Sequence, residues 1–118
     1  MTRHQESICR EVVAVLQYDL AALVSPCRTS MISWRRYEAA YVIRAVAGFS
    51  FPVIGRFFCR AHQPILRGCK LVAERMEASA VFRNQISELI CRAREVVAKV
   101  ETRSGRNPQA EFFAGLAA

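Results

Sequence analysis

The sequence has no uninterrupted apolar run of the length that crosses a membrane. Its most apolar stretches are interrupted by Asp19, Arg44 and Arg56, whereas a spanning helix needs about 18 or more consecutive apolar residues. Residues 1–6 also lack the basic start and apolar stretch of a secretion signal. We therefore expect a cytoplasmic protein without a membrane partner.

The sequence also lacks the residue clusters that hold metals, nucleotides or substrates. None of the cysteines forms a CxxC pair and the two histidines lie far apart, so we expect neither a zinc site nor a disulfide framework. We expect all of these cysteines to serve as small core hydrophobes: Cys9, Cys27, Cys59, Cys69 and Cys91. No GxxxxGKS or GxxxxGKT phosphate loop and no catalytic constellation is found, which predicts a non-enzyme without cofactor or bound nucleotide.

Positive charge, in contrast, is concentrated in the middle of the chain. Residues 28–75 hold nine basic residues against two acidic ones, so this segment alone carries the net charge of +7. A concentration of arginine is typical of a surface that binds a polyanion such as DNA. The alternative is a solvated surface that keeps the protein soluble.

Apolar residues recur at helical spacing along most of the chain, which predicts an all-α fold, a compact bundle of about five helices. We expect one domain over residues 1–103, with a loop at 27–33, and a flexible tail over 104–118, which follows a cluster of helix breakers. The expected helices cover residues 5–24, 34–47, 50–58, 63–77 and 78–103.

The third and fourth of these helices are arranged as in a helix-turn-helix, within a region of roughly 37–76. Ser50 and Pro52 start a short helix, the break at 59–62 follows, and a longer helix begins near Pro64. On this longer helix, polar residues recur at intervals of three and four and form an outer face: Gln63, Arg67, Lys70 and Glu74.

A longer stretch of the sequence resembles a known family. The segment RYEAAYVIRAVAGFSFPVIGRFFCRAHQPILRGCK, starting at Arg36, is similar to the C-terminal DNA-binding domain of the bacterial replication initiator DnaA, which has a Trp-repressor-like helix-turn-helix. The upstream segment ICREVVAVLQYDLAALVSPCR resembles that domain's first helix and loop, so the likeness covers about residues 7–100. The resemblance implies that the second helix of the motif enters the major groove of a nonameric box.

Carried over by position, the resemblance implies DNA contacts for Arg36, Arg60, His62 and Lys70. From the residues themselves we add Gln63, which suits an adenine edge, and Arg67, which suits a guanine edge or a phosphate. Further candidates for phosphate contacts are Arg28, Arg35 and Arg56. For His62 the alternative is a helix cap or a half-buried position at the turn. For Gln63 and Arg67 it is a solvated surface position, and for Arg56 an ordinary surface ion pair.

The sequence departs from the family's base-reading signature, which is Arg-Asp-His-Thr-Thr. Here the corresponding residues are Arg60, Ala61, His62, Gln63 and Pro64, so the aspartate and both threonines are missing. A glycine of the family's turn is deleted at Cys59, and Trp34, which we expect to pack internally, stands where a family arginine reaches the minor groove. We therefore expect an altered box preference.

The chain lacks the family's ATPase module, so we expect a nucleoid-associated regulator of transcription or replication that binds double-stranded DNA. The apolar flanks of the first and last helices are compatible with a homodimer as well as a monomer. The alternative function is a degenerate helix-turn-helix that binds a protein partner, either the initiator or the sliding clamp. The tail shows a weak resemblance to a clamp-docking peptide of the Gln-x-x-x-Phe type, through Gln109, Phe112 and Phe113.

Overall fold

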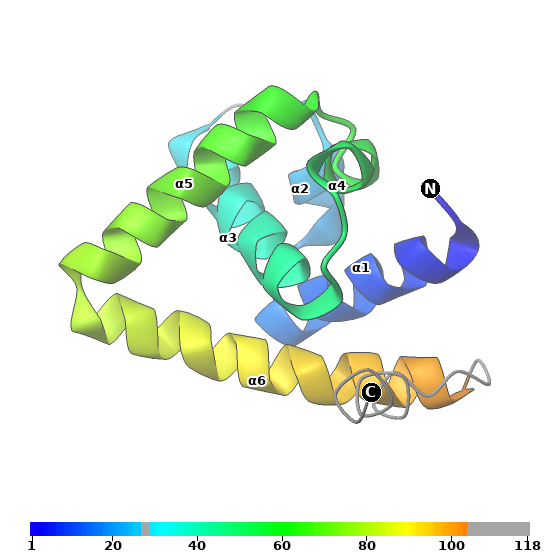
Figure 1. The fold of residues 1–118 in the computed structure, drawn as a ribbon. Helices are drawn as coiled ribbons and strands as arrows, with labels where there is room; N and C mark the ends of the chain where they lie inside the picture. The colour runs from blue at the N-terminus through cyan, green and yellow to red at the C-terminus, as the bar shows by residue number, and fades with distance from the viewer. Residues whose placement is uncertain (27–28, 104–118) are drawn as a thin grey trace, which may run out of the picture.

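The computed structural model describes residues 1–26 and 29–103, and within these ranges it contains six α-helices and no strand (Figure 1). The predicted all-α fold is therefore confirmed. The helices are α1 (Arg3–Leu16), α2 (Leu20–Val24), α3 (Ser30–Ala47), α4 (Phe51–Phe57), α5 (His62–Ala78) and α6 (Ala80–Arg103).

The first expected helix, over residues 5–24, is divided into α1 and α2. Gln17 ends α1 in the left-handed conformation, with φ 60°. Asp19 then caps α2, its side chain accepting a hydrogen bond from the backbone N–H of Ala21 at 3.1 Å. Between them, the Tyr18 hydroxyl donates to the carboxylate of buried Glu38 on α3. This long-range hydrogen bond accompanies the break, and the expectation of one continuous helix was wrong.

Helix α3 begins four residues earlier than we expected. The Thr29 hydroxyl accepts a hydrogen bond from the backbone N–H of Ile32 at 3.4 Å, which caps the start of the helix. Residues 30–33, predicted as part of a loop, are therefore helical. The predicted end of this helix is confirmed, because Gly48 forms its C-cap with φ 70°.

The core lies mainly between the first, third and last helices. Ile8 and Val12 of α1 belong to the same buried cluster as Ala39 of α3 and Ala93 and Val97 of α6. In Figure 1, α6 crosses beneath the rest of the molecule and runs alongside α1. At the start of α6, the chain turns back sharply from the direction of α5 (Figure 1).

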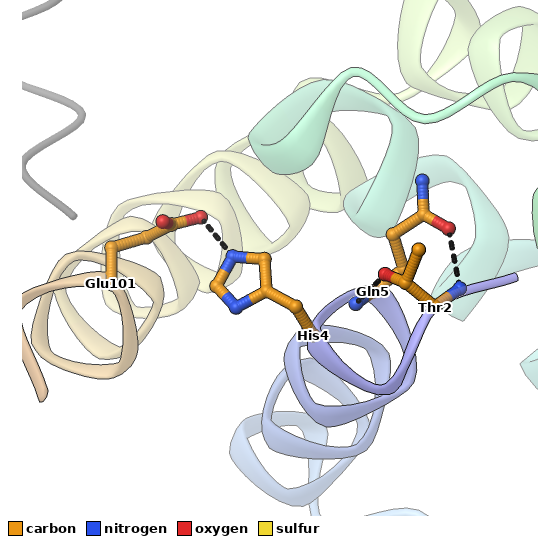
Figure 2. A network of polar contacts seen from close by, with 4 residues as sticks. All are labelled: Thr2, His4, Gln5 and Glu101. Carbon is orange, nitrogen blue, oxygen red and sulfur yellow. Dashed lines mark hydrogen bonds and ion pairs between the residues drawn. The ribbon is translucent and has the colours of Figure 1, made fainter. Parts of the chain in front are cut away.

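A polar contact also joins α1 to the end of α6. His4 Nε2 lies 2.9 Å from Glu101 Oε1, and both side chains are largely buried (Figure 2). Beside it, Thr2 and Gln5 form a capping box with reciprocal hydrogen bonds of 2.9 and 3.1 Å. The N-terminal turn of α1 is thus fixed by its own cap and by the tertiary contact between His4 and Glu101 of α6.

The elbow between α5 and α6 is packed by aromatic rings and one arginine. The guanidinium carbon of Arg75 lies 5.2 Å from the ring centroid of Trp34 and 4.4 Å from that of Phe82. Trp34 also contacts Tyr37 edge to face, with the ring centroids 6.5 Å apart. Trp34 therefore packs internally, as expected, and joins α3 to both helices of the elbow.

The cysteines divide into two groups, which corrects the expectation that they all lie in the core. Cys9 and Cys69 are buried, whereas Cys59 and Cys91 are exposed. Cys27 lies outside the described residues. Helical periodicity explains the position of Cys91, which faces away from the α6 stripe that contains Ala93 and Val97.

Candidate nucleic-acid interface

The middle of the chain forms a short helix, a tight connection and a long helix. Pro52 lies in the first turn of α4, which Ser50 precedes as the N-cap residue. Residues 58–61 connect α4 to α5, and the chain reverses there through Cys59, whose φ is 56°. The backbone N–H of Arg60 then donates to the Gly55 carbonyl at 2.8 Å and closes the turn.

Gly55 allows this turn to lie directly against α4. A Cβ atom at this position would lie 2.7 Å from the carbonyl oxygen of Arg60, a distance that real Cβ contacts do not reach. Because the obstructing atom belongs to the backbone, a larger residue would displace the turn. The glycine therefore fixes where α5 begins relative to α4.

The inner face of α5 holds this helix against α3. Ile65, Cys69 and Val72, which lie at the spacing of one helix face, are buried. Gly68 lies under the ring of Tyr37, and a Cβ atom there would come within 2.1 Å of a ring carbon. Burial raises the pKa of the Cys69 thiol to about 11.

The outer face of α5 carries four of the predicted site residues in its first half. All four are exposed to solvent: His62, Gln63, Arg67 and Lys70. Gln63 Nε2 lies 3.4 Å from His62 Nε2, so these two side chains can form a weak hydrogen bond. Within the described part of the chain, neither Arg67 nor Lys70 has an ion-pair partner. The four side chains therefore form one exposed, basic and hydrogen-bonding surface.

Two predicted arginines are placed differently from our expectation of surface contacts. Arg36 is only 4% exposed, and its Nε donates to the Leu23 carbonyl at 2.7 Å. Arg60 is partly buried, and its Nη2 donates to the Ser25 carbonyl at 2.8 Å. Both guanidiniums thus bind the protein's own backbone. The sequence could not indicate this, because the acceptors are main-chain atoms distant in the chain.

The remaining predicted residues are spread around these helices. Arg35 is exposed, with its guanidinium carbon 5.3 Å from the centroid of the Tyr18 ring, and Arg56 is exposed in the last turn of α4. Arg28 lies outside the described residues, as do the clamp-peptide residues Gln109, Phe112 and Phe113.

One further cation, which was not among the predicted DNA contacts, lies near Lys70. Arg44 of α3 is exposed, donates to the Phe49 carbonyl at 2.7 Å and lies 4.7 Å above the Phe51 ring. Together with Lys70, it borders a groove of about 300 Å³ whose other lining side chains are mainly apolar. Its membership of the basic segment 28–75 was the only sequence signal for it.

Fold and surface together define an all-α protein that presents one long helix with a buried inner face and an exposed basic outer face. Among the described residues, no three His, Cys, Asp or Glu side chains gather to hold a metal ion. No helix within the same residues is both long and apolar enough to span a membrane.

Sequence comparison relates the chain to bacterial replication initiators. It is 30% identical over 82 residues to chromosomal replication initiator protein DnaA 2 of Chlamydia trachomatis, which covers 70% of this chain and 18% of that protein. It is 30% identical over 81 residues to DnaA 1 of Protochlamydia amoebophila (69% and 18%), and 31% identical over 85 residues to DnaA of Roseiflexus castenholzii (71% and 18%).

The similarity is distant and covers a small part of each relative. The matched segment spans 18% of the length of each of these initiators. No protein-family model matches the chain. No solved structure matches it either.

Proposed function

We propose that this protein binds double-stranded DNA in a sequence-dependent manner, with α4, its connection and α5 acting as a helix-turn-helix. The observation that carries the proposal is the outer face of α5, where Arg67 and Lys70 are exposed without an ion-pair partner among the described residues. Such cations attract phosphates, and the neighbouring Gln63 can read a base edge. The similarity to chromosomal replication initiators supports a role in replication.

The charge distribution along α5 favours one orientation on DNA. His62, Gln63, Arg67 and Lys70 lie in the first part of the helix, whereas exposed Glu74 and Glu77 lie toward its end. Phosphates are attracted by the positive N-terminal end of a helix dipole and repelled by carboxylates. The N-terminal half of α5 is therefore the part that enters the major groove, which is wide enough to admit an α-helix.

The base preference is proposed to differ from that of the initiators. The DnaA-like signature is replaced here by Ala61, Gln63 and Pro64 around His62. Of these, the exposed Gln63 has an amide that can pair with adenine, while Ala61 and Pro64 have no side-chain hydrogen-bonding group. Selection should therefore return a short motif that is related to, but distinct from, the initiator box.

Selection from random duplexes at about 100 mM salt, followed by binding titrations across salt concentrations, tests this function. An enriched motif bound with steep salt dependence is the expected result. Arg67→Ala and Lys70→Ala should each lower the slope of log K against log salt by about 0.9. Arg83→Ala, which removes an exposed charge from α6 instead, is the matched control and should leave the slope unchanged.

Absence of both an enriched motif and salt-dependent affinity would remove the DNA-binding proposal. The remaining function would then be that of a protein-interaction module, which binds a protein partner without strong dependence on salt. A mass measurement of the free protein and of its DNA complex would show whether it binds as a monomer or as a homodimer on two half-sites.

A further inference from the structure

Two arginines, one from α3 and one from the connection between α4 and α5, converge on one backbone carbonyl. Arg60 Nη2 donates to the Ser25 carbonyl oxygen at 2.8 Å, and Arg36 Nη2 donates to the same oxygen at 3.3 Å. Arg36 Nε donates in addition to the Leu23 carbonyl at 2.7 Å. These contacts join the end of α2, the first half of α3 and the connection that precedes α5.

The accepting carbonyls belong to a helix end, where cations bind well. Helix α2 ends at Val24 and Ser25 is its C-cap residue, so Leu23 and Ser25 lie where carbonyls have no partner within the helix. The C-terminal end of a helix also carries partial negative charge. Guanidinium groups satisfy both the hydrogen-bonding and the electrostatic requirement, which explains why two arginines bind here.

The same contacts determine the position of the start of α5. Arg60 lies two residues before His62, the first residue of α5, and its backbone N–H is held by Gly55. Its side chain is held by Ser25. The connection is thus fixed from two sides, by α4 through the backbone and by α2 through the guanidinium.

We propose that Arg36 and Arg60 are positioning residues of the DNA interface, which hold the start of α5 against the end of α2 and do not themselves bind phosphate. This inference rests on the proposed function. Arg36 is 4% exposed, so a phosphate could reach it only if α3 or the turn moved. Arg60 is partly buried, and its Nη2 donates to the Ser25 carbonyl of the protein itself.

Positioning and phosphate contact differ in their dependence on salt. Each phosphate neutralised by a cation releases counterions and adds about 0.9 to the slope of log K against log salt. Removing a positioning residue weakens binding at all salt concentrations and leaves this slope unchanged. Removing a phosphate contact lowers the slope.

The test compares Arg60→Gln with Arg67→Gln in the full chain, by binding titrations over a range of salt and by hydrogen exchange of the free protein. For Arg60→Gln we expect weaker duplex binding with the wild-type slope, and about tenfold faster exchange of the Ser25 and Arg60 amides, which donate to Ala22 and Gly55. A tenfold change corresponds to about 1.4 kcal/mol. For Arg67→Gln we expect the converse, a slope lower by about 0.9 and unchanged exchange.

Arg36→Lys provides a second variant. Because the side chain of Arg36 is buried, a thermal melt first checks that this variant folds. A slope reduced by about 0.9 in Arg60→Gln would overturn the proposal, since Arg60 would then contact a phosphate directly. Unchanged exchange at Ser25 and Arg60 would overturn it as well. If the wild-type protein has no salt-dependent affinity for duplex DNA, the proposed function fails; faster exchange in Arg60→Gln would then still show that the arginine holds the turn.

Discussion

At the scale of single residues, the contact between Gly68 and Tyr37 determines how closely α5 approaches α3. Gly68→Ala should destabilise the protein by about 2 kcal/mol, because a methyl group would overlap the Tyr37 ring. Overpacking of this kind costs about 1–3 kcal/mol, more than the roughly 1 kcal/mol that alanine gains over glycine in a helix. Denaturant unfolding followed by circular dichroism measures the change.

A double-mutant cycle provides the control for this contact. In a Tyr37→Ala background the ring is absent, so Gly68→Ala should become neutral or stabilising there. A similar loss of stability in both backgrounds would show that the ring does not limit residue 68. Glu74→Ala, at an exposed position of the same helix, should change stability by less than about 0.5 kcal/mol.

The four described cysteines should differ in their reactivity. Burial raises the pKa of Cys9 to about 12 and that of Cys69 to about 11, and the thiolate is the reactive form. Exposed Cys59 and Cys91 should therefore react with iodoacetamide in the native protein, while Cys9 and Cys69 react only after denaturation. Peptide mass mapping identifies the labelled sites, and rapid native labelling of Cys9 would contradict the packing of α1 against the core.

The candidate surface could be predicted from the sequence only where the relevant contacts are local. The spacing of Gln63, Arg67 and Lys70 within one helix placed them correctly on an exposed face. Arg36 and Arg60 could not be placed in this way. Their partners are carbonyl oxygens up to 35 residues away, and every residue has a carbonyl whatever its side chain.

At the scale of helices and turns, the connection between α4 and α5 carries strain at Cys59. A residue with a Cβ atom costs about 1–2 kcal/mol in the left-handed conformation, and Cys59 has a φ of 56°. Cys59→Gly should therefore raise the free energy of unfolding by about 1 kcal/mol, the net effect after the greater chain entropy that glycine brings to the unfolded state.

Cys59→Ser is the matched control for this prediction. Serine keeps the Cβ atom and so should retain the strain, with little change in the midpoint of thermal unfolding. If serine stabilised the protein as much as glycine does, loss of the thiol rather than relief of backbone strain would be the cause.

Helix boundaries followed the sequence where glycine or proline marks them. Gly48 and Pro52 correctly indicated the end of α3 and the start of α4. The break after α1 has no such marker, because Gln17 is an ordinary helix former that here adopts φ 60°. The hydrogen bond from Tyr18 to Glu38, 20 residues further along the chain, accompanies this break and is invisible to local patterns.

At the scale of the whole molecule, the buried ionisable groups predict a loss of stability at alkaline pH. Cys9 and Cys69 have pKa values of about 12 and 11 in the folded protein, against 9.0 for an unperturbed thiol. Burial, with a hydrogen bond to Glu38, raises the pKa of Tyr18 as well. The unfolded chain loses the thiol protons from about pH 9.0 and the Tyr18 proton from about pH 10.0, whereas the folded protein keeps them to higher pH. Stability is therefore retained below pH 9.0 and declines as pH rises.

Urea unfolding measured between about pH 8 and 11 tests this, with an upper limit of about 1.4 kcal/mol per pH unit for each group. The double variant Cys9→Ala and Cys69→Ala should show a shallower decline, because its remaining alkaline dependence comes from other groups such as Tyr18. An equally steep decline in this variant would exclude the two thiols as its cause.

The packing of α1 against α6 has a consequence for the order in which the molecule can form. His4 and Glu101 are 97 residues apart in the chain and 2.9 Å apart in space. During synthesis, the apolar side chains Ile8 and Val12 are made well before α6, which helps to cover them. The apolar face of α1 in the nascent chain therefore stays exposed until nearly all described residues have left the ribosome. During this period, chaperone binding or aggregation competes with folding.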